Sequence, residues 1–336
     1  MKQLSIIVPV YNVEKYIRAC FESLFKQGLD DSYFEVIIVN DGTKDNSMKM
    51  IDDITRQHNN IIIINQDNQG LSVARNNGIA IAKGEYILMP DSDDFLVNYS
   101  LLPLLHKALE TKADIVVADF LTIENEDMPN LTEVVQREFS VQEKTGQQLF
   151  IEDLNPYQCY VWRTLYRREF LTANHLRFIK GINYQDVPFT HECYLKAQRC
   201  LKTSWILYVY RKNRPEAATT QFTVKKSRSY CIAMAATWNL KQTMKLSPTA
   251  SYKLEADVYT SFSMMIYHTI CKLNKREDRH KVIDTLKSEA PQLKFTQGLR
   301  QKMTSIMLRY FPYLYIDIYY IYGQIVLKKV RNIWKK

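Results

Sequence analysis

Two spacings of hydrophobic residues alternate over the first 120 residues of the chain. Continuous apolar runs are typical of strands buried on both faces. Between these runs, apolar residues recur every three or four positions, as they do in amphipathic helices. The predicted strands are Leu4–Val10, Phe34–Val39, Ile61–Ile64, Tyr86–Met89 and Asp114–Ala118. Alternating strands and helices predict the α/β class, with a mostly parallel central sheet flanked by helices.

The helices predicted between these strands have recognisable ends. Asn12 precedes the first helical pattern as a predicted N-cap, and Glu14 lies in its first turn. Gly84 is predicted to end the third helix. The predicted helices are Val13–Leu24, Asp45–His58, Leu71–Lys83 and Leu101–Glu110.

The pattern changes after residue 120, so we divide the chain into the segments 1–120, 121–225, 226–300 and 301–336. No element is predicted between residues 121 and 160. Residues 162–210 are aromatic-rich and predicted helical, and they close with a strand at Trp205–Tyr210. Residues 229–300 predict helices with polar outer faces.

The segment 301–336 differs in composition from the rest of the chain. Only Arg309 and Asp317 are charged between Met303 and Leu327, six tyrosines lie there, and a basic cluster follows. Pro312 and Asp317 argue against a membrane-spanning helix. Two interpretations stay open: an interfacial anchor on an anionic membrane, or a helix packed on the domain or on a twin subunit.

Charge is distributed unevenly. Residues 1–120 hold 17 acidic and 11 basic residues, residues 121–300 hold 18 and 27, and residues 301–336 hold 1 and 7. An acidic first third argues against a nucleic-acid binder, which usually has one continuous basic face. The distribution favours carboxylates gathered around a metal, beside basic surfaces that meet an anionic partner.

Cysteine usage and the N-terminus favour the cytoplasm. The six cysteines show neither a CxxC pair nor a zinc-ligand spacing, so we expect reduced thiols. The first apolar run is too short for a signal peptide. We therefore expect a cytoplasmic protein, with a peripheral position on the inner face of the cell membrane if the tail is an anchor.

Four polar loops each follow a predicted strand, where open α/β sheets bind ligands. The loops are Pro9–Asn12 with Glu14 beyond, Asn40–Thr43 with Asp45 beyond, Asn68–Gly78, and Pro90–Asp94. Each loop alone could be an ordinary turn.

The fourth loop carries three carboxylates within four residues, at Asp91, Asp93 and Asp94. Like charges this close repel one another, and a hard divalent cation relieves that repulsion. The loop therefore favours a site for Mg²⁺ or Mn²⁺. The alternative is a helix N-terminus with acidic residues in its first turn.

The four loops, in this order at these strand ends, resemble those of the family-2 glycosyltransferases of bacterial polysaccharide biosynthesis. The resemblance covers about residues 1–120 and returns over about 162–220. It implies the GT-A fold, with a nucleotide-sugar-binding half at 1–120, an acceptor-binding half at 121–225, and a C-terminal helical region.

The resemblance also implies roles for residues in the loops. Tyr11, Asp41 and Arg75 would hold the nucleoside of a nucleotide-sugar, usually UDP, and Asp91 and Asp93 would form the metal-binding Asp-x-Asp pair. Thr43 stands where Ser is more usual. The donor-binding residues implied in this way are Pro9, Tyr11, Asn12, Glu14, Asp41, Asn68, Gly70, Arg75, Asp91 and Ser92.

The catalytic base implied by the resemblance is Asp186. Family members usually have Glu-Asp there, whereas this chain has Gln185-Asp186. The implied reaction is metal-dependent, inverting transfer of a sugar to a hydroxyl of a glycan or of a lipid-diphosphate-linked acceptor. Homo-oligomers are compatible with the sequence.

Two other functions are alternatives to sugar transfer. A nucleotidyltransferase would carry a glycine-rich phosphate loop after the first strand, and Val10–Val13 contains no glycine. A non-catalytic protein of the same fold, binding nucleotide-sugars or acting as a membrane scaffold, is the alternative that Gln185 favours.

Overall fold

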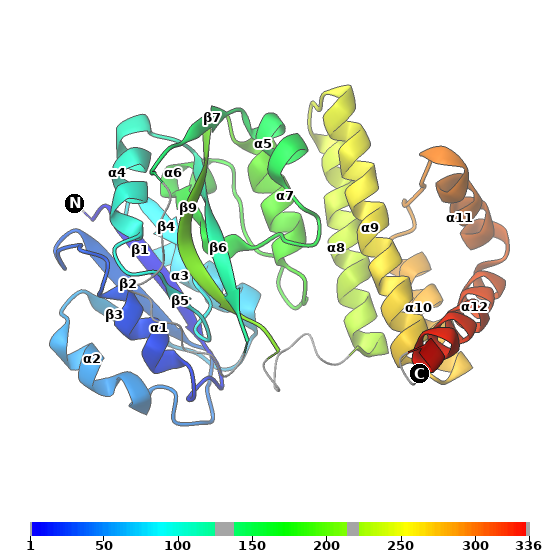
Figure 1. Ribbon diagram of the computed structural model, residues 1–336, viewed down its shortest axis with the longest axis horizontal. Coiled ribbons are helices and arrows are strands. Elements are labelled where there is room, and N and C mark those ends of the chain that lie inside the picture. The colour runs from blue at the N-terminus through cyan, green and yellow to red at the C-terminus, as the bar shows by residue number, and fades with distance from the viewer. Residues whose placement is uncertain (1, 125–137, 214–221, 334–336) are drawn as a thin grey trace. The chain divides into compact units, whose positions relative to one another are not determined.

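The computed structural model describes residues 2–124, 138–213 and 222–333, with side chains up to residue 325. The chain divides into two compact units (Figure 1). The first comprises Met1–Leu154, Gln158–Gly181 and Phe189–Pro215 and holds the sheet. The second comprises Asn155–Tyr157, Ile182–Pro188 and Glu216–Lys336 and is helical.

The described residues of the first unit form one nine-stranded sheet, ordered β3-β2-β1-β4-β8-β6-β9-β5 with β7 on β9. β8 is antiparallel to both β4 and β6, so six strands run one way and β5, β7 and β8 run the other. The predicted α/β class with a mostly parallel sheet is confirmed. The strands are β1 (Leu4–Val10), β2 (Phe34–Asn40), β3 (Ile61–Asn65), β4 (Tyr86–Leu88), β5 (Phe95–Leu96), β6 (Ile115–Ile123), β7 (Gln142–Lys144), β8 (Thr164–Arg167) and β9 (Cys200–Arg211).

Helices cover both faces of this sheet. Alternate residues of β1, such as Ile6 and Val8, pack with α1 and α4 in one core cluster. α3 lies against the other face, where a Cβ on Gly78 would come within 2.3 Å of Ile7 Cγ2. The helices are α1 (Ile17–Leu24), α2 (Asp52–Gln57), α3 (Leu71–Ile81), α4 (Leu101–Thr111), α5 (Gly146–Asp153), α6 (Arg168–Ala173) and α7 (Asp186–Lys196), with short 3₁₀ turns at Lys49–Ile51 and Val161–Arg163.

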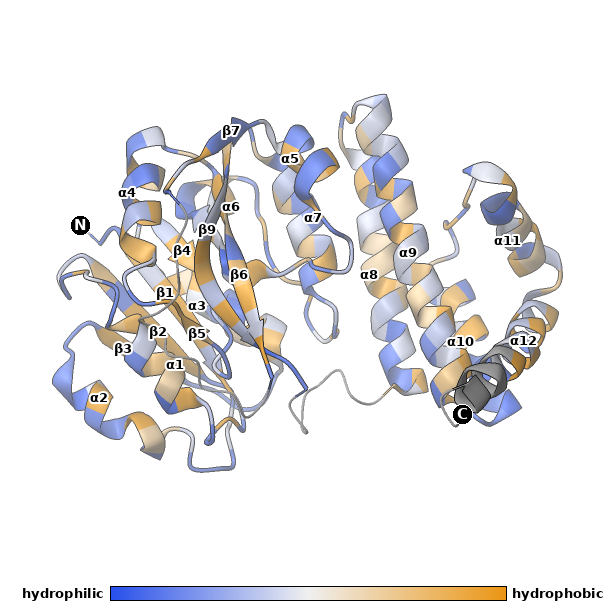
Figure 2. Cartoon of the chain, in the orientation of Figure 1, coloured by the Kyte–Doolittle hydropathy of each residue, from blue (hydrophilic) through white to orange (hydrophobic). Residues whose placement is uncertain are grey.

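The hydrophobic strands lie at the centre of the unit because helices cover both of their faces (Figure 2). All seven positions of β1 are buried. The edge strand β3 is partly exposed along its length, as expected of a strand with one neighbour. Burial of β1 and β2 holds the ends of these strands, and the loops that follow them, in fixed register.

Several local predictions were wrong. The first helix begins at Ile17 rather than Val13, and Asn12 has a left-handed φ of 53° in the loop instead of capping it. The second predicted helix is reduced to a 3₁₀ turn and α2. The stretch predicted helical from residue 162 contains β8, and the strand predicted at Trp205 already begins at Cys200.

The second unit consists of α8 (Val224–Thr243), α9 (Pro248–Lys272), α10 (Arg276–Glu289), α11 (Gly298–Tyr310) and α12 (Pro312–Ile333). These helices share a core that includes Trp238, Phe262, Phe295 and Ile316. None of the described helices is both long and apolar enough to cross a membrane.

The predicted segment boundaries fall within elements of the structure. The boundary after residue 120 lies inside β6, that after residue 225 lies just inside α8, and that after residue 300 lies inside α11. The assignment of a separate role to each of the four segments stays a prediction. The six cysteines form no disulfide, and among them Cys271 alone is partly exposed.

Candidate functional site

The loops that follow β1 and β2 are tied to each other by hydrogen bonds. The backbone N–H of Asn12 donates to Thr43 Oγ1 over 2.8 Å, and Asn12 Oδ1 accepts from the Lys44 N–H over 3.1 Å. Glu14 Oε2 accepts from the Asn46 N–H over 2.9 Å. These bonds explain why Asn12 does not cap α1: its side chain is engaged by the neighbouring loop.

Asp45 organises the same pair of loops. Its carboxylate accepts hydrogen bonds from the Glu14 N–H at 3.0 Å, Thr43 Oγ1 at 2.8 Å and Ser47 Oγ at 2.5 Å. Burial opposes ionisation of this group, but the bonds from Ser47, Glu14 and Thr43 outweigh burial and hold the pKa of Asp45 below its usual value. Asp45 therefore holds the loops after β1 and β2 together.

Asp41 joins the second loop to the third. The side chain is 3% exposed, and its two oxygens accept from Gln66 Nε2 at 2.7 Å, the Gln69 N–H at 2.9 Å and the Gly70 N–H at 2.9 Å. Gly70 has a φ of 86°, which a residue with a Cβ rarely adopts. Sequence reasoning missed Gln66, which also accepts from Asn77 Nδ2 in α3.

Arg75 connects the third loop region to the fourth. Its guanidinium is 2% exposed, contacts Asp91 Oδ1 over 2.5 Å and lies 5.3 Å from the centre of the Phe178 ring. Among the described residues, Arg75 Nε has no hydrogen-bond partner. The structure thus places Arg75 beside the carboxylates of the fourth loop.

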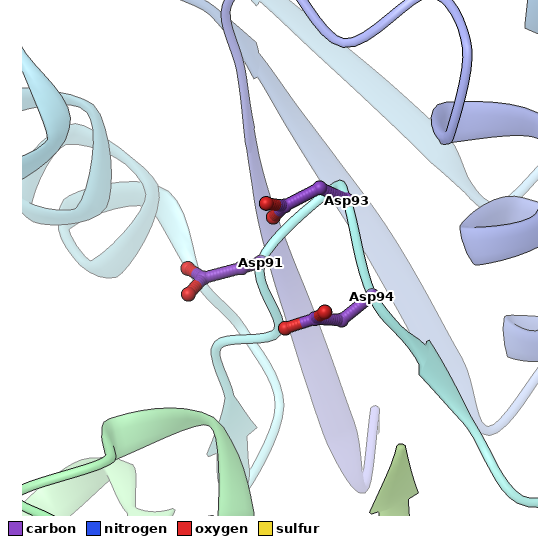
Figure 3. Close-up of side chains that lie close together, drawn as sticks. All are labelled: Asp91, Asp93 and Asp94. Carbon is purple, nitrogen blue, oxygen red and sulfur yellow. The ribbon is translucent and has the colours of Figure 1, made fainter. Parts of the chain in front are cut away.

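Asp91, Asp93 and Asp94 form an acidic cluster that we call the aspartate cluster. Oxygens of all three carboxylates lie within 4.8 Å of one another. The three side chains come from different parts of the loop and point in a similar direction (Figure 3). No helix begins here, because β5 follows directly at Phe95, so the alternative of an acidic helix N-terminus is wrong.

Asp94 is the buried member of the aspartate cluster. It is 1% exposed and accepts from the Arg211 N–H at 2.8 Å and from Tyr208 Oη at 3.0 Å. Burial, followed by the charges of Asp93 and Asp91, raises the pKa of Asp94 well above its usual value. Three hard oxygen donors with this mutual repulsion fit Mg²⁺ or Mn²⁺, so the residues present suit the ion expected from the sequence.

Tyr208 in β9 supports both ends of the fourth loop. Its hydroxyl donates to Asp94 and accepts from the Asp91 N–H over 3.0 Å. Sequence reasoning did not predict this contact, because Tyr208 lies more than 110 positions along the chain from the loop.

The remaining predicted donor-binding residues are distributed along the same strand ends. Pro9 is buried in β1 and Ser92 is 5% exposed in the fourth loop. Tyr11 is 42% exposed at the end of β1, and Asn68 is exposed in the third loop. Their contacts with a donor stay predictions.

Asp186 is the first residue of α7 and is partly buried. It belongs to the second unit, whereas the aspartate cluster belongs to the first. Burial raises the pKa of Tyr184, and the charge of Asp186 adds to that increase. Gln185 beside it is 5% exposed, and no described residue bonds its Oε1.

Comparison with known proteins finds sequences and structures named as glycosyltransferases among those similar to this chain. Residues 5–171 match the model of glycosyl transferase family 2. The chain is 36% identical over 213 residues to EpsJ of Bacillus subtilis, an uncharacterized glycosyltransferase. That match covers 62% of this chain and 61% of EpsJ, so it spans less than two thirds of the relative.

Solved structures share the fold. TarS of S. aureus, residues 1–349 with bound UDP-GlcNAc, superposes with a TM-score of 0.65 at 21% identity, covering 85% of this chain and 80% of that one. A mannosyltransferase from Pyrobaculum calidifontis, in complex with GDP-Man and Mn²⁺, superposes with a TM-score of 0.55 at 14% identity, covering 99% of this chain and 88% of that one.

Proposed function

Because the chain belongs to glycosyl transferase family 2, we propose that it transfers a sugar from a nucleotide-sugar to an acceptor hydroxyl in cell-surface polysaccharide biosynthesis. The observation that carries this proposal is the aspartate cluster in the loop that follows β4. The proposed donor is a UDP-sugar, as in the TarS complex. The proposed acceptor is a glycan or a lipid-diphosphate-linked glycan.

Asp91 and Asp93 are the proposed ligands of Mg²⁺ or Mn²⁺. Asp94 is held by Tyr208 and Arg211, so it shapes the loop while the other two carboxylates remain partly exposed. A bound divalent cation supplies positive charge to the departing nucleoside diphosphate. Arg75 offsets the charge of Asp91 and keeps that carboxylate oriented through their ion pair.

The nucleoside is proposed to bind at the ends of β1 and β2. The exposed ring of Tyr11 offers an apolar surface for a base. Asp41 acts there through the loop it anchors, since its oxygens already hold Gln66, Gln69 and Gly70. The buried anchoring fixes the loop before the donor arrives, which reduces the entropy lost on binding.

Asp186 is the proposed general base that removes the proton from the attacking hydroxyl. A single displacement with one base inverts the anomeric centre of the transferred sugar. Asp186→Asn should lower the transfer rate on the order of 10²- to 10⁴-fold while UDP-sugar affinity is kept. Glu192→Gln, further along α7, is the matched control. Full transfer by Asp186→Asn would refute the assignment of the base.

Titration calorimetry of UDP-sugars with and without Mn²⁺ tests the donor and the metal. Asp93→Asn should weaken Mn²⁺ binding. Asp53 is an exposed partner of Arg18, so Asp53→Asn is the control and should leave Mn²⁺ binding unchanged.

An assay for hydrolysis of a UDP-sugar in the presence of Mn²⁺ distinguishes an enzyme from the alternative, a non-catalytic binding or scaffold protein. Binding without any release of UDP would favour that alternative.

A further inference from the structure

The last two described helices expose a continuous row of large apolar side chains, which we call the tail face. Its members recur every three or four positions, and each is 48–76% exposed. The tail face consists of Leu299, Met303, Ile306 and Tyr310 on α11, Phe311 between the helices, and Leu314, Ile318, Ile321, Tyr322 and Ile325 on α12.

The opposite sides of the same helices pack on the second unit. Tyr315 and Ile316 are buried in its core, and Thr304 is 3% exposed. α11 and α12 are therefore anchored from one side, and the tail face is left without a partner in the described chain. Isolated exposed apolar residues are ordinary, whereas a contiguous row of this length marks a binding surface.

The charge of the C-terminal segment indicates what kind of surface the tail face binds. Residues 298–336 contain eight Lys or Arg residues and one acidic residue, Asp317. That carboxylate is already bonded to Arg276 at 2.7 Å and His280 at 3.2 Å. Two copies of so basic a segment would repel each other, whereas anionic lipid headgroups complement it. Arg300, Lys302 and Arg309 are exposed on α11 beside the apolar row.

A pocket of about 270 Å³ adjoins the tail face within the second unit. Tyr322 belongs to both the face and the pocket lining. The other walls are mainly apolar and aromatic, including Ile266, Ile270 and Tyr319, and Arg300 is the one charged lining residue. This combination suits a hydrocarbon chain that ends in a phosphate.

We propose that the tail face binds the surface of an anionic membrane, with α11 and α12 lying in the plane of the interface and the pocket receiving one lipid chain. Tyrosines and basic residues beside an apolar row are the composition of helices that lie in this way. This binding does not depend on sugar transfer.

Vesicle co-sedimentation of the full chain tests the proposal. Wild type should bind vesicles of mixed phosphatidylcholine and phosphatidylglycerol and should bind pure phosphatidylcholine weakly. The double variant Ile306→Asp with Ile321→Asp should lose on the order of tenfold or more in affinity. Tyr252→Asp, which changes an equally exposed residue on α9, is the control. Unchanged melting temperatures establish that the exposed substitutions preserve the fold.

Two further variants test the charge and the pocket. Lys302→Gln with Arg309→Gln should reduce affinity for the anionic vesicles about fivefold per charge. Ser263→Phe, which fills the pocket, should reduce it severalfold, and unchanged affinity would overturn the role of the pocket.

Sedimentation velocity distinguishes a membrane from a second copy of the chain. A wild-type monomer that binds anionic vesicles supports the proposal. The proposal is overturned if Ile306→Asp with Ile321→Asp converts a dimer to a monomer while vesicle binding is unchanged. It is equally overturned if the wild type binds neutral and anionic vesicles alike.

Discussion

Several buried or partly buried carboxylates of the site hold its loops in place through hydrogen bonds. Asp41, Asp45 and Asp94 each accept at least two hydrogen bonds from neighbouring loops or strands. Their carboxylates replace the backbone partners that irregular loops lack. The partly exposed carboxylates Asp91 and Asp93 can then face a ligand without the loop being reorganised.

Tyr208→Phe removes the hydroxyl that joins Asp94 to the Asp91 N–H. Both groups would lose a partner inside the protein, so the free energy of unfolding should fall by about 1–3 kcal/mol. Affinity for Mn²⁺ should also fall, since the loop is held less firmly. Chemical denaturation and calorimetry measure the two effects. Tyr99→Phe, at a 68% exposed position, should change neither.

The acidic loop could be predicted from sequence because its three carboxylates are adjacent in the chain. The bonds of Tyr208 and Gln66 could not, since each joins positions that are distant along the chain and leave no local pattern. Asn12 shows the converse error. It has the local signature of a cap, but contacts with the loop after β2 determine its conformation instead.

At the scale of elements, the strands of the parallel core were predicted well because burial on both faces gives continuous apolar runs. β1 has the predicted bounds. β8 was missed because its four residues, Thr164–Arg167, lie in an aromatic-rich stretch with no alternation. β5 and β7 have two and three residues, too few for any periodicity.

The contact between α3 and β1 depends on the absence of a side chain at Gly78. Gly78→Ala places a Cβ within 2.3 Å of Ile7 Cγ2. Overpacking of a core typically costs about 1–3 kcal/mol, which exceeds the gain of about 1 kcal/mol from better helix propensity. We therefore expect Gly78→Ala to lower the free energy of unfolding, as measured by denaturant titration. Ala80→Gly, at an exposed position of α3, measures the propensity effect alone; a stabilised Gly78→Ala would contradict the close packing.

Glu255 connects α9 to two other segments of the second unit. Its carboxylate accepts from the Thr296 N–H at 2.5 Å and from Lys241 Nζ at 3.2 Å. Burial opposes its ionisation, but the bonds from Thr296 and Lys241 outweigh burial and lower the pKa of Glu255 in the folded state.

A lowered folded-state pKa means that the unfolded chain binds the proton more tightly. The stabilisation by Glu255 is therefore present above the ordinary pKa of about 4.3 and is lost as pH falls through the folded-state value. Glu255→Gln should be less stable than wild type by about 1–3 kcal/mol at neutral pH. The difference should shrink below about pH 4. Denaturation across this range measures it, with the exposed Glu277→Gln as control; a difference independent of pH would contradict the ionised state.

At the scale of the whole molecule, the two units have separate hydrophobic cores. A ligand that binds only the folded first unit stabilises it by about 2.7 kcal/mol at a hundred times its Kd. UDP with Mn²⁺ should therefore raise the melting temperature of the first unit. Glu255→Gln should leave the affinity for UDP unchanged, as calorimetry can establish. A large loss of UDP affinity in this variant would argue against independent cores.

The distribution of cysteines has a practical consequence. Burial raises the pKa of Cys20 and Cys193, and it protects both thiols from reagents. Cys271 is partly exposed and lines the pocket beside the tail face. A maleimide dye added to the unmodified protein should therefore attach there first. The fluorescence of that dye would then report whether a hydrocarbon chain enters the pocket, as proposed.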